Sequence, residues 1–183
     1  MADILNIVDE NDQVIGQESR EEIHRRGLVH REIHVYFLTP NGEMIFQHRA
    51  KDKDTFPDLL DVAVGGHVEI GESYIAAAVK ETEEETGLKL APAELKLIDK
   101  VREDTFDPAT GKLNRVFNAC YVYVYAGALS ALRLEAGKAL GFVAYPLDRL
   151  SKLADEEKSR FIPAVLNYVS RIDWSLWLNK NTI

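Results

Sequence analysis

The sequence predicts a single α/β domain, in which helices pack on the faces of a mixed β-sheet. The chain has 183 residues, 46% of them hydrophobic and 28% charged, which is ordinary for one globular domain with a buried core. Strand patterns outnumber helix patterns, and they occur as pairs around short turns. A sheet that is built from such pairs needs helices to cover its apolar faces.

The N-terminal segment, residues 1–30, is predicted to form a β-hairpin followed by a short helix. The stretch "DILNIVDENDQVIGQ" has two apolar runs around the turn "DEND". Ser19 is a typical N-cap residue with Glu22 three positions later, and Gly27 is typical of a helix end. We therefore treat residues 1–30 as an extension within a single domain that spans residues 1–183.

The middle of the chain is predicted to form a hairpin, a short strand and a central helix. The stretch "EIHVYFLTPNGEMIFQHR" has two apolar runs around "TPNG", and "DVAVGGHV" is typical of a strand that ends in glycines. Residues 73–86 are predicted to be helical, because Ile75 and Val79 begin an apolar side at helical spacing and Gly87 is a good C-terminal stop.

The remaining residues are predicted to complete the sheet and to cover it with helices. The stretches "LKLIDKVRED" and "LNRVFNACYVYVYAG" are predicted to pair as strands around the turn "DPATGK". A further strand is predicted at "ALGFVAYP", and closing helices are predicted at "PLDRLSKL" and "EEKSRFIPAVLNYVSRI".

Composition excludes several classes of protein. The net charge of −8 argues against a broad surface for nucleic acid polymers, and an acidic protein that handles an anionic substrate needs local cations, most simply bound metal. Cys120 is the single cysteine, so we expect a buried core residue and no disulfide framework. The chain has no apolar run long enough for a membrane span, and its start resembles no signal peptide, so we expect a cytoplasmic protein.

Glu81, Glu84 and Glu85 are concentrated in one short part of the central helix. Residues three and four apart lie side by side, so these carboxylates form a stripe, which we expect opposite the side that includes Thr86. Each exposed like-charge pair costs about 0.2–0.5 kcal/mol. The stripe is either a solvent-exposed acidic face, with Lys80 offsetting Glu84, or a site for a divalent cation such as Mg²⁺, which prefers oxygen ligands.

The spacing of residues 66–88 resembles the Nudix box, G-x5-E-x7-R-E-U-x-E-E-x-G-U, where U is aliphatic. Seven of the nine fixed positions match, and chance agreement is on the order of 10⁻⁷ per starting point. The two departures are Lys80, in place of the family's arginine, and Thr82, in place of an aliphatic residue. The matching residues are Gly66, Glu72, Glu81, Glu84, Glu85, Gly87 and Leu88.

This resemblance implies a Nudix-type α/β/α sandwich that hydrolyses a small-molecule diphosphate linked to another group. It implies that Glu81, Glu84 and Glu85 hold Mg²⁺ or Mn²⁺, with the backbone carbonyl of Gly65 or Gly66 as a further ligand. Metal ions suit this reaction because they neutralise phosphate charge and acidify a bound water.

The resemblance also implies roles for residues around the metal. Glu72 would support a water or another metal, and Lys80 would orient the box glutamates through ion pairs. Lysine keeps the charge of arginine but lacks its planar fork. The general base is either Glu84 or an acid from a later loop, where Glu135 is the nearby candidate. Arg49 is either a contact for the substrate phosphate or a surface residue.

Several stretches are similar to the branch of the family that is related to isopentenyl-diphosphate isomerase. Gly65 occupies the place of the isomerase's catalytic cysteine, and Val116 and Asn118 occupy the places of its glutamate pair. We therefore favour a hydrolase, with an isomerase or a non-catalytic binding module as the alternatives. His34 and His67 match metal-binding histidines of the isomerase, and they either bind metal, contact phosphate or are structural remnants.

The strand around Cys120 also carries alternating tyrosines on one face. This aromatic face either packs within the sheet, stacks on a base or sugar, or forms the surface of a homodimer.

Overall fold

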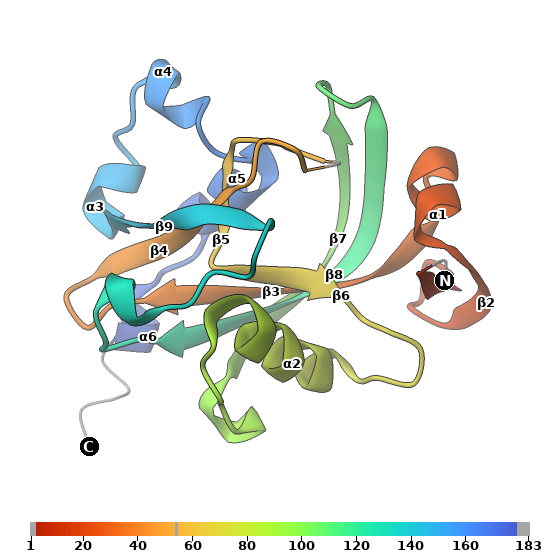
Figure 1. The fold of residues 1–183 in the computed structure, drawn as a ribbon, viewed down its shortest axis with the longest axis horizontal. Coiled ribbons are helices and arrows are strands. Elements are labelled where there is room, and N and C mark those ends of the chain that lie inside the picture. The colour runs from red at the N-terminus through yellow and green to blue at the C-terminus, as the bar shows by residue number, and fades with distance from the viewer. Residues whose placement is uncertain (1–2, 54, 179–183) are drawn as a thin grey trace.

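The computed structural model describes residues 3–53 and 55–178, which form a two-stranded sheet, a seven-stranded mixed sheet and covering helices (Figure 1). The strands are β1 (Ile4–Val8), β2 (Val14–Ser19), β3 (Val29–Leu38), β4 (Glu43–Arg49), β5 (Leu60–Val62), β6 (Val64–His67), β7 (Lys96–Asp107), β8 (Lys112–Val124) and β9 (Ala139–Pro146). The α-helices are α1 (Arg20–Arg26), α2 (Tyr74–Thr86), α3 (Leu147–Leu150), α4 (Asp155–Lys158), α5 (Pro163–Arg171) and α6 (Ser175–Leu178).

The larger sheet is mixed, as predicted. Its main strand order is β5-β4-β3-β8-β7, with β6 paired to β3 and β9 paired to β4. β3 runs parallel to β8, whereas β7 and β8 form the predicted antiparallel pair. The predicted hairpin of β3 and β4 is paired only beside its turn, at Phe37↔Ile45 and Leu38↔Met44. Beyond those pairs, β3 pairs with β6, whereas β4 pairs with β5 and β9.

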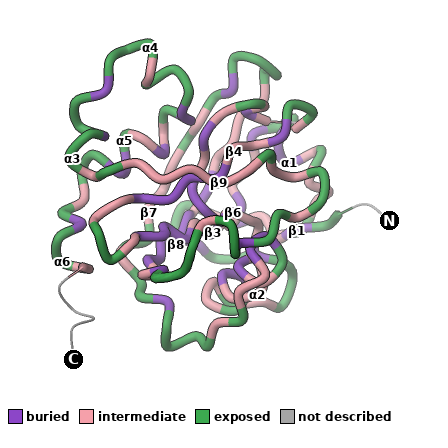
Figure 2. The backbone as a smooth tube through the Cα atoms, turned by 60° about the vertical axis from the view of Figure 1, so that its left-hand side comes forward, coloured by how far each residue is buried: buried purple, intermediate pink, exposed green. Residues whose placement is uncertain are grey.

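Two apolar layers, one on each face of the sheet, confirm the predicted sandwich. Ile33, Val35 and Phe37 of β3 pack on the face that α2 covers, and the alternate residues Tyr36 and Leu38 pack on the face that α5 covers. Burying each large side chain contributes roughly 1.5–3 kcal/mol. Figure 2 shows these buried segments in the interior of the molecule. Cys120 is buried in the same core, as predicted.

The N-terminal extension also forms as predicted. β1 and β2 pair antiparallel, and the Oγ atom of Ser19 accepts a hydrogen bond from the backbone N–H of Glu22 at 3.3 Å. Gly27 ends α1 with a left-handed φ of 62°. In the part of the chain that is described, no helix is long and apolar enough to cross a membrane.

The C-terminal helices differ from the prediction. The stretch "EEKSRFIPAVLNYVSRI" was expected to be one helix, but it forms α4 and α5, separated by a bridge to β5. Pro163 begins α5 because its ring suits the first helical turn and disfavours helix in the residue before it. The backbone N–H of Ile162 donates to the carbonyl of Leu60 at 3.0 Å instead. The short helix α6 was not predicted.

Candidate active site

The central helix α2 presents its glutamates toward β6. Ser73 caps its start, and Gly87 ends it with a φ of 75°. Glu85 is only 5% exposed and lies beside the buried Thr82 and Thr86, so the expectation that the glutamates lie opposite the buried side is wrong. The side chain of Glu81 is 12% exposed, whereas Glu84 is exposed. The stripe is therefore no ordinary solvent face, and its inner edge is buried.

The glycines of β6 let the helix approach the backbone closely. A Cβ atom at Gly66 would lie 2.5 Å from Cδ of Glu81, so no side chain fits there without displacement. The backbone N–H of Gly65 donates to Oε2 of Glu85 at 3.3 Å, and Nε2 of Gln47 donates to the same oxygen at 3.2 Å. The structure thus brings the predicted ligands Glu81, Glu85 and Gly66 together.

Burial changes the acidity of this cluster. Burial, together with repulsion from neighbouring carboxylates, raises the pKa of Glu81 to about 7 and that of Glu85 to about 8, although the nearby lysines lower both values. Buried carboxylates that repel one another fit a divalent cation, because a cation removes the repulsion and satisfies their oxygens. The residues present are therefore suited to Mg²⁺ or Mn²⁺.

Lys80 binds the acids at the start of the box. Its Nζ atom lies 2.8 Å from Glu69, 3.2 Å from Glu72 and 3.7 Å from Glu81, so the suggested pairing with Glu84 is not what the structure has. Glu72 also accepts a hydrogen bond from the backbone N–H of Glu69 at 3.2 Å. Glu72 thus contacts Lys80, and Lys80 in turn contacts Glu81, which lines the cavity.

Replacing Lys80 is expected to change catalysis through Glu81. We expect Lys80→Met to lower kcat about tenfold, because Glu81 loses its partner, and Lys80→Arg to keep or raise kcat. The control is Lys89→Met, since Lys89 is exposed and pairs with Glu83 at 3.2 Å. Steady-state kinetics measure the effect. Equal kcat values in Lys80→Met and Lys89→Met would rule out an orienting role for Lys80.

A cavity of about 300 Å³ lies in front of the box glutamates. Arg49 lines this cavity, but its guanidinium is paired with Asp61 at 2.9 Å and donates to the carbonyls of Thr55 and Phe56. Arg49 therefore orders the loop at the cavity edge, and its role in binding phosphate stays a prediction. Lys53 and Lys138 line the same cavity and add positive charge near the acids.

The proposed loop acid lies outside the cavity wall. Lys138 pairs with Glu135 at 2.7 Å, and Glu135 is not among the residues that line the cavity. Glu84, by contrast, is exposed on the wall beside Glu81 and Glu85. Among the described residues, the geometry therefore favours Glu84 over Glu135 as general base.

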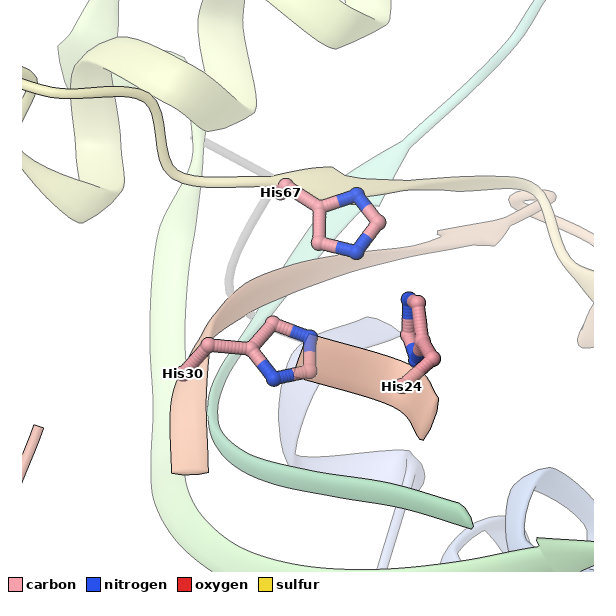
Figure 3. Close-up of side chains that lie close together, drawn as sticks. All are labelled: His24, His30 and His67. Atoms are coloured by element: carbon pink, nitrogen blue, oxygen red, sulfur yellow. The ribbon is translucent and has the colours of Figure 1, made fainter. Parts of the chain in front are cut away.

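A second group of potential metal ligands consists of three histidines, two of which, His24 and His67, line the same cavity (Figure 3). His24 of α1, His30 of β3 and His67 of β6 each offer a ring nitrogen, and these atoms all lie within 4.8 Å of one another. The Nε2 atom of His67 is 3.3 Å from Oε1 of Glu32. Burial lowers the pKa of His67 to about 3, so its ring is neutral and keeps a lone pair at neutral pH.

His34 does not belong to this histidine cluster. Its Nδ1 atom lies 2.8 Å from Nδ2 of Asn118, the residue in the place of an isomerase glutamate. His24 and His30 were not predicted as site residues, because only the fold brings them to His67. The signal available was the recurrence of histidine before and after the helix stop at Gly27, together with His67.

A sandwich that directs the glutamates of its central helix into a polar cavity is the architecture expected of a diphosphate hydrolase. Residues 28–165 match the family model described as NUDIX domain, so the chain belongs to the NUDIX family and is a Nudix-type hydrolase. The chain is 33% identical over 161 residues to an uncharacterized Nudix hydrolase of Clostridium acetobutylicum, covering 85% of this chain and 75% of that protein.

One further relative agrees with this family, and two solved structures share the fold. An uncharacterized Nudix hydrolase of Streptomyces coelicolor is 39% identical over 128 residues, covering 70% of this chain and 67% of that protein. A crystal structure from Deinococcus radiodurans has a TM-score of 0.71 at 22% identity, covering 92% of this chain and 98% of that chain. The NUDIX domain of Shewanella oneidensis NrtR, complexed with ADP ribose, has a TM-score of 0.57 at 12% identity, covering 84% and 96%.

Proposed function

We propose that the protein is a Mg²⁺-dependent hydrolase that cleaves the diphosphate bond of a nucleoside diphosphate linked to another group, or of a related organic diphosphate. The observation that carries this proposal is the pair of the largely buried Glu81 and the buried Glu85, whose pKa values are raised and whose carboxylates line the cavity beside Gly66. Such a pair is unfavourable without a cation, and a diphosphate brings a charge that the same cation neutralises.

The residues of the site then have distinct roles. Glu81, Glu84 and Glu85, with the carbonyl of Gly65 or Gly66, would hold the ion, which neutralises the diphosphate and acidifies a water. Glu84 is exposed to the cavity, so it can accept the proton of the attacking water. Lys53 and Lys138, which line the same cavity, would hold the phosphate oxygens. Glu72 acts indirectly, by positioning Lys80.

A panel of substrates tests this function against its alternatives. The panel contains ADP ribose, nucleoside diphosphates, dinucleotides, nucleotide sugars, thiamine diphosphate and prenyl diphosphates, each with Mg²⁺. Release of phosphate or of a nucleoside monophosphate supports the hydrolase. An isomerised prenyl product without phosphate release would establish the isomerase instead, although Gly65 has no thiol. Tight binding without turnover, unchanged in Glu85→Gln, would establish a binding module.

We also propose that the histidine cluster holds a second cation, of a kind that prefers nitrogen, such as Zn²⁺ or Co²⁺. Three imidazoles and one carboxylate, Glu32, are a suitable donor set for these ions, whereas Mg²⁺ prefers oxygen. His30 lies on β3 and His24 on α1, so an ion there would join these two elements.

The second site is tested by metal content and thermal stability. The wild-type protein is expected to bind one equivalent of Co²⁺ with visible absorption and to gain several degrees in Tm. His30→Asn should lose both effects. The control is His48→Asn, because His48 lies on β4 and pairs with Asp58 at 2.9 Å. Identical Co²⁺ spectra in the two variants would eliminate the histidine site.

Three expectations from the sequence stay predictions. They are the single-domain organisation of residues 1–183 with residues 1–30 as an extension, a homodimer, and a cytoplasmic location.

A further inference from the structure

The N-terminal extension forms part of the cavity wall. The NUDIX match begins at residue 28, so β1, β2 and α1 precede the family's own domain. Nevertheless, Asp3, Leu5 and Arg20 of this segment line the same cavity as Glu81 and Glu85. A substrate that is bound at the glutamates therefore faces side chains that the shared domain does not supply.

The extension is packed against the domain by apolar contacts. Leu5 of β1 is 1% exposed and Ile23 of α1 is 0% exposed. Each of these two elements therefore buries a large apolar side chain. Leu5 also forms an antiparallel bridge with Glu69, in the loop that precedes α2. The backbone N–H of Arg20 donates to the carbonyl of Asp3 at 2.8 Å, which holds these two cavity residues side by side.

A buried aspartate fastens the tip of the hairpin. Asp12 is 7% exposed, and its carboxylate accepts hydrogen bonds from Arg31 of β3 at 2.6 Å, Lys100 of β7 at 2.7 Å and the hydroxyl of Tyr74 at 3.0 Å. Burial would raise the pKa of Asp12, but these donors outweigh it and hold the pKa below its ordinary value.

This aspartate connects the extension to the helix that carries the glutamates. Tyr74 is the first residue of α2, and Arg31 and Lys100 come from two further strands of the larger sheet. One carboxylate thus joins the hairpin to three separate elements of the domain. Removing it would leave two cations and a hydroxyl without this acceptor, and the loss is costly for Arg31 and Tyr74, which are partly buried.

We propose that the extension binds the polar group attached to the diphosphate, with Arg20 as a binding residue and Asp12 as the residue that positions the extension. A guanidinium that donates and an Asp3 carboxylate that accepts suit the hydroxyl groups of a sugar. The expected ligand class is therefore a diphosphate that carries a sugar. This inference rests on the proposed function, because it assumes that a diphosphate occupies the site at the glutamates.

The first test compares a sugar-bearing diphosphate with bare pyrophosphate. Calorimetry in Ca²⁺ measures the affinity of ADP ribose and of inorganic pyrophosphate. Arg20→Met is expected to weaken ADP ribose about tenfold and to change pyrophosphate less than twofold. Arg25→Met is the control, because Arg25 lies on the same helix but is exposed and pairs with Glu22. Equal losses for both ligands, or no loss for either, would overturn the role of Arg20.

The second test loosens the extension without touching the cavity. Asp12→Asn keeps the size of the side chain but removes the charge that Arg31 and Lys100 share. We expect faster hydrogen exchange in residues 4–19, unchanged exchange in α2, and the same selective loss of ADP ribose binding. Glu10→Gln is the control, since Glu10 is an exposed neighbour in the same turn that pairs with Arg102 at 3.3 Å. Selective loss in both variants, or in neither, would overturn a positioning role for Asp12.

These tests separate the inference from the proposed function. A wild-type protein that binds ADP ribose no more tightly than pyrophosphate would overturn the inference, even if it hydrolyses other diphosphates. A wild-type protein that hydrolyses no member of the substrate panel would overturn the function, whatever the two affinities are.

Discussion

Glu85→Gln is expected to lower kcat by about a thousandfold while the protein stays folded. Glutamine has nearly the size of glutamate, and the buried position already accepts hydrogen bonds from Gln47 and Gly65. What the variant loses is the negative charge for the divalent cation, and the chemistry that such a cation supplies is worth several kcal/mol. Steady-state kinetics with the best substrate of the panel measure the effect, and circular dichroism checks the fold.

The matched control for this variant is Glu83→Gln. Glu83 lies two positions away on the same helix, but its side chain is 46% exposed and pairs with Lys89. We expect Glu83→Gln to keep kcat within a factor of about two, as surface substitutions usually do. If Glu85→Gln were as active as Glu83→Gln, the acidic stripe would be structural, and the cation site would have to lie elsewhere.

The second large effect is a loss of stability with rising pH when divalent cations are absent. The carboxyl pKa of Glu85 rises from an ordinary 4.5 to about 8 in the folded protein. Between these values the folded protein keeps a proton that the unfolded chain releases, so unfolding becomes more favourable as pH rises. The stabilising contribution is complete below pH 4.5 and is lost through about pH 8.

Denaturant unfolding in EDTA measures this dependence. At pH 8, Glu85→Gln is expected to be more stable than the wild-type protein, on the order of 2 kcal/mol, because a neutral side chain needs no proton. Adding Mg²⁺ should stabilise the wild-type protein and leave the variant almost unchanged. A wild-type stability that is constant from pH 5 to 8 in EDTA would contradict the buried, proton-holding state of Glu85.

Local patterns predicted most of the fold and the box. Ser19, Gly27 and Gly87 were recognisable as helix caps because capping depends on residues within one turn. The spacing of the glutamates was likewise sufficient to identify the family. Their burial was not predictable, since it depends on Gly65 and Gly66 leaving room for α2, and a helical wheel shows only which residues share a side.

Long-range contacts were the part that the sequence did not reveal. The donors to Asp12 come from residues 31, 74 and 100, and no spacing in the sequence relates them. The histidine cluster is similar, because His24, His30 and His67 meet only when α1, β3 and β6 are in place. Pro163 shows the reverse case, a local signal that was present in the sequence and that ends the predicted long helix.

The central claim is that the buried glutamates of α2 form the divalent-cation site of a diphosphate hydrolase. Titration calorimetry with Mg²⁺ tests it most directly. Mg²⁺ prefers oxygen ligands, so it is expected to bind the glutamates in preference to the histidine cluster. We expect the wild-type protein and Glu83→Gln to bind Mg²⁺ with the same affinity, and the double variant Glu81→Gln/Glu85→Gln to lose at least about tenfold. Unchanged Mg²⁺ affinity in the double variant would contradict the account.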